Sequence, residues 1–278
     1  MSGIIVFLLV GGIGALAQIL DGSLGMGFGV FGSSMMIATG FAPAVAVAAI
    51  NIAKIFAGLS SGISHLTLGN VRRDWLWPLA LSGVPGGVLG AYLLTSVPPE
   101  RARPWVGLLL LVMGGLIIWR TLRWRVPCSP QAWDKRCRDC PSQKRDWQWL
   151  THQAKHNGVL KLGAVGFLAA LVNGLSGGYG PVATSGVMLL EKGEPRQAIG
   201  TVNLAEFFVA TTVATTILLR KGLVGFPIGL VAALAIGGLL TAPLAAFLCR
   251  RLPGRALAFA VGIALIGFNY RLVASILP

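Results

Sequence analysis

Most of this chain consists of apolar stretches that contain no Asp, Glu, Lys or Arg. Several reach or exceed the roughly 20 residues that an α-helix needs to cross a bilayer. Only 12% of the 278 residues are charged, about half the share found in soluble domains. A soluble globule and a disordered chain are therefore excluded, and we expect an all-α polytopic membrane protein with about 8–10 membrane helices. The stretches are 1–20, 22–53, 55–71, 75–99, 104–119, 162–190, 197–205, 207–219, 222–249 and 256–270.

The sequence contains an internal repeat, whose two copies lie about 152 residues apart. The matched positions include glycine, proline and asparagine as well as generic apolar residues, so chance similarity explains them poorly. We therefore expect a first transmembrane repeat in 1–122, a connecting loop in 123–158 and a second repeat in 159–278. The matched pairs include Gly27 with Gly178, Gly29 with Gly180, Pro43 with Pro195, Asn51 with Asn203 and Phe56 with Phe208.

Each repeat opens with a stretch that is too long and too rich in glycine for one helix. Residues 4–39 would form a helix of roughly 54 Å, against a hydrocarbon core of about 30 Å. We therefore predict helix breaks at 21–29 and 173–181, where short half-helices meet near mid-membrane. Re-entrant hairpins would make the two repeats inverted, whereas long tilted spans would make them parallel. The distribution of Lys and Arg favours inverted repeats by a small margin.

The connecting loop is strongly basic. Residues 120–161 contain ten basic and three acidic residues, and so carry +7 of the net charge of +14. This pattern is typical of a cytoplasmic segment near anionic lipid headgroups, and we expect no nucleic-acid binding. The loop also contains Cys137, Cys140, His152 and His156 at metal-ligand spacing. We favour reduced, exposed thiols over a structural zinc site there, and the zinc site stays an alternative.

The glycines of the two breaks are candidates for an anion-binding site. Half-helix N-termini present unpaired N–H groups and the positive end of the helix dipole. We therefore expect the substrate to contact Gly27, Gly29, Gly178, Tyr179 and Gly180. The alternative is that these glycines only allow close helix packing, which is the interpretation we give to the GxxxG pairs of the chain. Those pairs are Gly58 with Gly62 and Gly83 with Gly87.

Two charged residues interrupt apolar stretches at matched repeat positions. Lys54 and Glu206 each follow a helix-starting proline by 11 residues, about 16 Å along the helix, which places both near the bilayer centre. Asn51 and Asn203 precede them by three residues and share their helix faces. A lone charge at this depth costs about 3 kcal/mol, so each needs a partner. Either Lys54 and Glu206 only pair with each other, or Lys54 and the asparagines bind an anion while Glu206 carries a coupling proton.

Two further titratable residues lie near predicted helix ends. Asp21 adjoins the first break, so it either faces the cytoplasm at a helix end or shares proton coupling with Glu206. His65 precedes Arg72 and Arg73, and we expect it at the membrane interface. We find no hydrolase triad, phosphate-binding loop or catalytic carboxylate pair, so we expect no enzymatic activity, no cofactor and no catalytic metal.

The paired motifs of the two repeats resemble the TauE/SafE-type sulfite exporter family. They are Gly-Met-Gly-Phe-Gly, ending at Gly29, and Gly-Gly-Tyr-Gly-Pro, ending at Pro181, together with Asn-x-Ala-Lys at Lys54 and Asn-x-Ala-Glu at Glu206. The resemblance covers nearly the whole chain outside residues 121–158. It implies secondary transport of small anions such as sulfite, sulfonates or other organosulfur acids, often as export, in a prokaryotic inner membrane.

Our prediction is therefore an anion transporter that works by alternating access and is linked to the proton-motive force. Two alternatives stay open. One is an anion channel, which would lack coupling to protons. The other is a membrane-embedded thiol or sulfur-transfer protein that uses Cys137 and Cys140.

Overall fold

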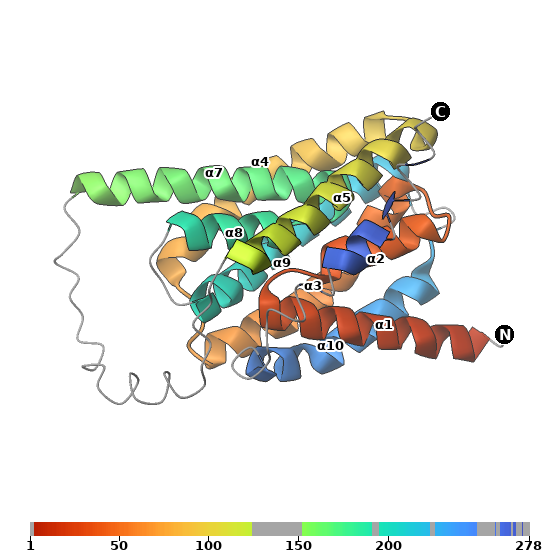
Figure 1. The fold of residues 1–278 in the computed structure, drawn as a ribbon, viewed down its shortest axis with the longest axis horizontal. Helices are drawn as coiled ribbons and strands as arrows, with labels where there is room; N and C mark the ends of the chain where they lie inside the picture. Colours follow the sequence, from red (N-terminus) through yellow and green to blue (C-terminus); the bar gives the residue numbers. More distant parts are fainter. Residues whose placement is uncertain are drawn as a thin grey trace.

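The structure of the protein is a computed structural model, which describes residues 3–123, 152–190, 195–222, 226–248, 259, 262–267, 269–270 and 274. This part of the chain is helical and contains no strand, which agrees with the predicted fold class. The helices are α1 (Gly3–Leu24), α2 (Phe28–Ala38), α3 (Pro43–Thr67), α4 (Arg73–Ser96), α5 (Pro99–Arg123), α7 (His152–Ser176), α8 (Gly180–Leu190), α9 (Pro195–Lys221) and α10 (Ile228–Leu248) (Figure 1).

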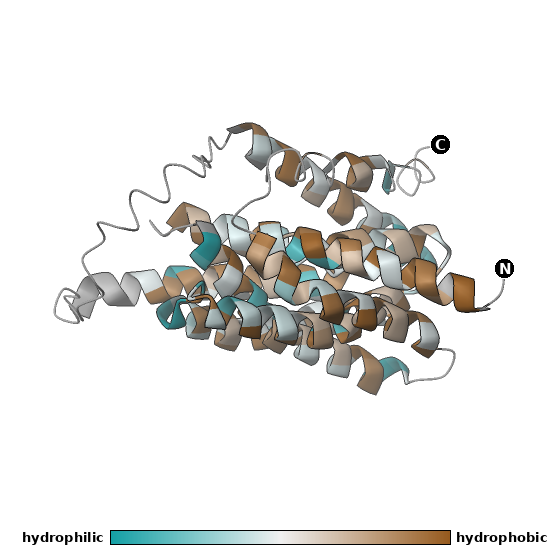
Figure 2. Ribbon diagram, turned by 90° about the horizontal axis from the view of Figure 1, so that it is seen from below, coloured by the Kyte–Doolittle hydropathy of each residue, from teal (hydrophilic) through white to brown (hydrophobic). Residues whose placement is uncertain are grey.

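Seven of the helices in the described residues are long and apolar enough to cross a membrane, whereas α2 and α8 have only 11 residues each. Apolar residues run along the long helices, and strongly hydrophilic residues form only a few patches (Figure 2). Many large apolar side chains are exposed on the outside of the bundle, where lipid would cover them. The chain is therefore a multi-pass membrane protein.

The predicted helix breaks lie where glycine ends a helix. Gly25 follows α1 with φ +68°, and Gly177 follows α7 with φ +81°, a left-handed conformation that other residues rarely adopt. One part of the prediction is wrong, because only the second arm of each hairpin is short. Helices α1 and α7 have 22 and 25 residues. Helix α7 already begins at His152, in polar sequence that lies before the apolar stretch.

Close glycine contacts set the directions in which the helices pack. Gly14 of α1 packs on Leu234 of α10, and Gly22 packs on Ala245, so α1 and α10 run parallel. Helices α4 and α7 also run parallel, since Gly86 of α4 packs on Phe167 of α7 and Gly90 packs on Leu171. These pairs are among the most extensive helix contacts in the described part of the chain. Glycine allows the backbones to approach closely in both pairs.

Helices α3 and α9 cross in the middle of the molecule and run antiparallel. Gly62 of α3 packs on Leu204 of α9, and Gly200 near the start of α9 packs on Asn70, just after α3. Helix α3 therefore runs opposite to α9, its counterpart in the predicted second repeat. Figure 1 shows the same opposed directions for α1 and α7. Inverted repeats require such an arrangement, although the common origin of the halves stays a prediction.

A buried charged centre between the helix breaks

An ion triad lies where α1, α3 and α9 meet. The ammonium of Lys54 on α3 lies 3.1 Å from Asp21 Oδ2 on α1 and also forms an ion pair with Glu206 Oε1 on α9. Each of the three residues is at most 2% exposed. The structure therefore pairs Lys54 with Glu206, as the matched depths predicted, and adds Asp21 as a second carboxylate.

Two carboxyl groups share one amino group, in a place from which water is largely excluded. The ring of Phe28 lies 5.9 Å from the ammonium, a distance at which an aromatic face still attracts a cation. Asp21 Oδ1 also accepts a hydrogen bond of 3.3 Å from the Phe28 backbone N–H at the start of α2. The triad is thus tied to the first helix break through both the ring and the backbone of one residue.

A chain of asparagines extends the polar centre toward the second break. Asn173 near the end of α7 donates a hydrogen bond of 2.8 Å to Asn51 Oδ1 on α3. The amides of Asn51 and Asn203 each donate to a backbone carbonyl one turn earlier in their own helix, those of Val47 and Ile199. Each of these two amides therefore keeps one N–H for a ligand.

The two glycine breaks pack directly against each other. A Cβ on Gly29 would overlap the carbonyl oxygen of Gly177, and a Cβ on Gly180 would lie 2.5 Å from that of Gly25. Thr184 of α8 also donates a hydrogen bond of 2.6 Å to the Gly25 carbonyl. Gly29 and Gly180 are therefore needed for the backbones to meet, whatever else they do.

A side chain at Gly27 or Gly178 would have more room than one at Gly29 or Gly180. A Cβ on Gly27 would find its nearest neighbour at 3.2 Å, the Cβ of Leu20, and one on Gly178 would lie 2.8 Å from a methyl group of Val30. Contact of these glycines with an anion stays a prediction. Of the predicted GxxxG pairs, Gly62, Gly83 and Gly87 have close neighbours, whereas Gly58 has none, so its assignment to helix packing is wrong.

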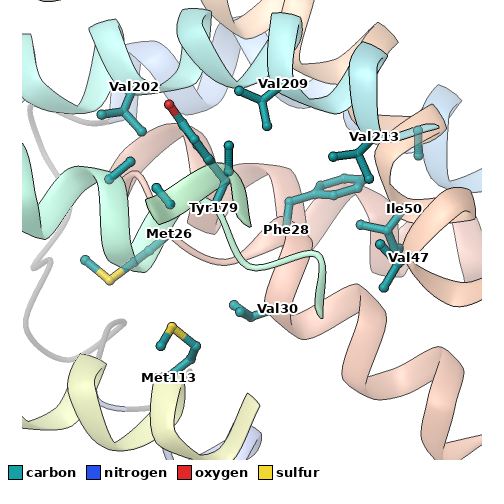
Figure 3. Close-up of a cluster of buried hydrophobic side chains, with 14 of the residues drawn as sticks. Met26, Phe28, Val30, Val47, Ile50, Met113, Tyr179, Val202, Val209 and Val213 are labelled. Carbon is teal, nitrogen blue, oxygen red and sulfur yellow. The ribbon is translucent and has the colours of Figure 1, made fainter. Parts of the chain in front are cut away.

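Two aromatic residues, one from each break, fill the space between α3 and α9. Figure 3 shows Phe28 beside Ile50 and Val213, and Tyr179 with its hydroxyl near Val202. Both side chains are fully buried. The Tyr179 hydroxyl has no hydrogen-bond partner within the described part of the chain. It therefore keeps its hydrogen bond free, and its contact with a substrate stays a prediction.

One alternative for Asp21 is excluded: it lies in the last turn of α1, but it is 1% exposed and paired with Lys54 and so does not face the cytoplasm. His65 lies in the last turn of α3 and is fully buried in the protein, where its Nε2 lies 3.0 Å from the Gly22 carbonyl oxygen and its Nδ1 lies 3.3 Å from Asn70 Nδ2. Cys137 and Cys140 lie outside the described residues.

Asn173 was not among the residues predicted to form the centre, although the sequence contains a signal for it. Asn173 and Asp21 are separated by 152 residues, the same spacing as Lys54 and Glu206. Extending the repeat to the start of each break would have paired them. The repeat would then have predicted that Asp21 and Asn173 lie at the centre together with Lys54 and Glu206.

The architecture and the site together define a polytopic helical membrane protein whose charged centre is enclosed by two broken-helix hairpins. Transporters commonly bind their substrates at such breaks. The family model for sulfite exporter TauE/SafE matches residues 10–272, so the chain belongs to this family and is a membrane transporter. The Bacillus subtilis (strain 168) protein named "Probable membrane transporter protein YtnM" is 33% identical over 272 residues, 98% of this chain and 83% of that protein. No solved structure matches the chain.

Proposed function

We propose that the protein carries small sulfur-containing anions, such as sulfite or an organosulfonate, across a prokaryotic inner membrane together with a proton. The observation that carries this proposal is the sharing of one ammonium, that of Lys54, by two carboxylates. An anion cannot reach Lys54 while both carboxylates are ionised, because it would add a further negative charge to a centre that already carries −1. Protonation of one carboxylate removes that obstacle.

Glu206 is the carboxylate that we assign to the coupling proton. When Glu206 is protonated it releases Lys54, and the anion takes its place on the ammonium. Asn51, Asn203 and the Tyr179 hydroxyl then donate hydrogen bonds to the anion's oxygens, and the backbone N–H groups at Gly27 and Gly178 add to the positive field. The ion pair with Asp21 holds Lys54 in position.

Coupling to a proton determines the direction in which the anion is transported. A monoanion and a proton move together without net charge, so the combined gradients of anion and pH decide the direction. One pH unit corresponds to about 1.4 kcal/mol, or a tenfold ratio of anion concentration. Export against an inward proton gradient of one unit therefore proceeds only while the internal anion is more than about tenfold concentrated.

Flux measurements in proteoliposomes test this proposal. Uptake of sulfite and of ethanesulfonate is measured first and establishes which anion is transported. Ethanesulfonate stays a monoanion at any pH near neutral. A pH gradient with acid outside should then accumulate ethanesulfonate about tenfold per unit in the wild type. Equilibration without accumulation would indicate a channel.

Two variants separate the roles of the charged residues. Lys54→Ala should lose anion binding, whereas Glu206→Gln should bind and equilibrate the anion without pH-driven accumulation. Glu100→Gln, at an exposed position on α5, is the matched control and should behave as the wild type. If Glu206→Gln still accumulates the anion fully, Glu206 is only a structural partner of Lys54.

A further inference from the structure

A stripe of buried residues on α3 leads away from the triad toward the end of the helix. Lys54, Gly58, Ser61 and His65 are spaced by four, three and four residues, so they share one face of the helix. All four are buried. The stripe ends near Asn70, which donates to the His65 ring and precedes the start of α4.

The facing part of α1 is polar as well. A Cβ on Gly22 would lie 3.5 Å from both Gln18 Nε2 and Ser61 Oγ, so these two groups converge on one point beside Asp21. His65 donates from Nε2 to the Gly22 carbonyl oxygen, which can only accept, and its Nδ1 accepts from Asn70. The ring lies at the far end of the stripe, between α1 and the segment that leads to α4.

Several of these polar atoms have no protein partner. Both amide atoms of Gln18 and the hydroxyl of Ser61 are fully buried and unpaired within the described residues. A buried polar atom without a hydrogen bond costs about 1–3 kcal/mol, and proteins commonly satisfy such atoms with ordered water. Next to them is open space: apart from its chain neighbours and its own helix backbone, no atom lies within 4 Å of a Cβ placed on Gly58.

The second half has no such stripe. The residues 152 positions after Gln18, Ser61 and His65 are Ala170, Val213 and Ile217, all apolar and all buried. A path for protons needs hydrogen-bonding groups, and the side chains at these equivalent positions of the second half offer none.

We infer that Gln18, Ser61 and the space at Gly58 form a hydrated path that brings protons to the triad from the end of the molecule where α4 and α7 begin. The titratable groups along it are Asp21 on α1, Lys54 and His65 on α3 and Glu206 on α9. Helix α10, which packs on α1 and α3, contributes none. The use of this path for coupling depends on the proposed function, whereas its hydration does not.

Thiol accessibility tests the hydration directly. In full-length protein with Cys128, Cys137, Cys140 and Cys249 replaced by serine, Ser61→Cys should react with a small water-borne methanethiosulfonate at least tenfold faster than Val213→Cys. Both positions are fully buried, so a difference reports water and not surface exposure. Equal rates at the two positions would overturn the path, whatever the transport assays show.

Filling the space tests its role in coupling. Gly58→Leu should lower pH-driven ethanesulfonate accumulation at least tenfold and leave anion exchange intact, because exchange keeps the proton bound. Gly12→Leu, which has the same free space but lies on the exposed face of α1, is the control. Unchanged accumulation in a folded Gly58→Leu protein would overturn the path's role in coupling. If Glu206→Gln still accumulates ethanesulfonate in response to the pH gradient, the proposed function is contradicted. The hydration shown by the reactivity of Ser61→Cys would not be affected by that result.

Discussion

Removing the Lys54 ammonium should destabilise the protein far more than removing the Glu206 carboxylate. In Lys54→Met the two carboxylates remain without their shared cation. Both contacted the same nitrogen, one of them at 3.1 Å, so their oxygens lie within about 6 Å of each other. Two unit charges at about 6 Å repel by roughly 3 kcal/mol at an effective dielectric of 20. This agrees with the 3–5 kcal/mol that breaking a buried ion pair commonly costs, about 4 kcal/mol on average.

In Glu206→Gln, the loss of an attraction and the removal of a repulsion nearly cancel in the unfolding free energy. It forfeits a charge-assisted hydrogen bond of about 1.5–3 kcal/mol but also removes the repulsion of roughly 3 kcal/mol, so its net effect is close to zero. The double variant Lys54→Met/Glu206→Gln should accordingly recover about 3 kcal/mol relative to Lys54→Met alone.

Thermal unfolding of the four proteins in one detergent measures this double-mutant cycle. At about 2–4 °C per kcal/mol, Lys54→Met should unfold roughly 6–12 °C below the wild type, and the double variant should regain most of that loss. The reasoning is refuted if Glu206→Gln is the less stable single variant, or if the double variant is less stable than Lys54→Met. Either result would mean that the carboxylates do not repel each other in the folded protein.

Two further predictions concern packing around the triad. Gly29→Ala should fail to give monodisperse protein in size-exclusion chromatography, because its Cβ would overlap the Gly177 carbonyl, whereas Gly27→Ala should elute normally. Asn173→Ala should lower the unfolding free energy by about 1–3 kcal/mol, because it leaves Asn51 Oδ1 buried without its donor. Asn203→Ala, whose bond goes to its own helix, should cost less in the same thermal assay; equal losses would contradict this ranking.

The sequence predicted those features that depend on local chemistry. Both breaks were found because a glycine-rich run interrupts a stretch too long for one helix, and Gly25 and Gly177 end α1 and α7 there. The equal spacing of Lys54 and Glu206 from their prolines put the two charges at one level. By contrast, Asp21 lies far from Lys54 along the chain, and their contact depends on how α1 packs on α3 and α10. No local pattern encodes that register.

The sequence also predicts helix ends poorly where a helix extends into polar sequence. Apolar composition indicates where a chain lies in lipid, but a helix continues beyond it as long as its backbone hydrogen bonds are satisfied. Helix α7 therefore begins at His152, and the predicted short arm was wrong. The burial of His65 could not be predicted for a related reason, since it depends on a contact with the Gly22 carbonyl of α1, which no pattern near His65 indicates.

The predicted inverted repeat would also explain why the two halves differ at the centre. Where a two-fold axis passes between antiparallel helices, equivalent positions lie opposite each other, as Lys54 of α3 and Glu206 of α9 do. Identical charges at this position would repel in a low dielectric, so two identical halves could carry no charge there. A lysine in one half and a glutamate in the other make the contact attractive. The positions 21 and 173 differ in the same way, since one is aspartate and the other asparagine, and this second difference leaves one more carboxylate than ammonium at the centre.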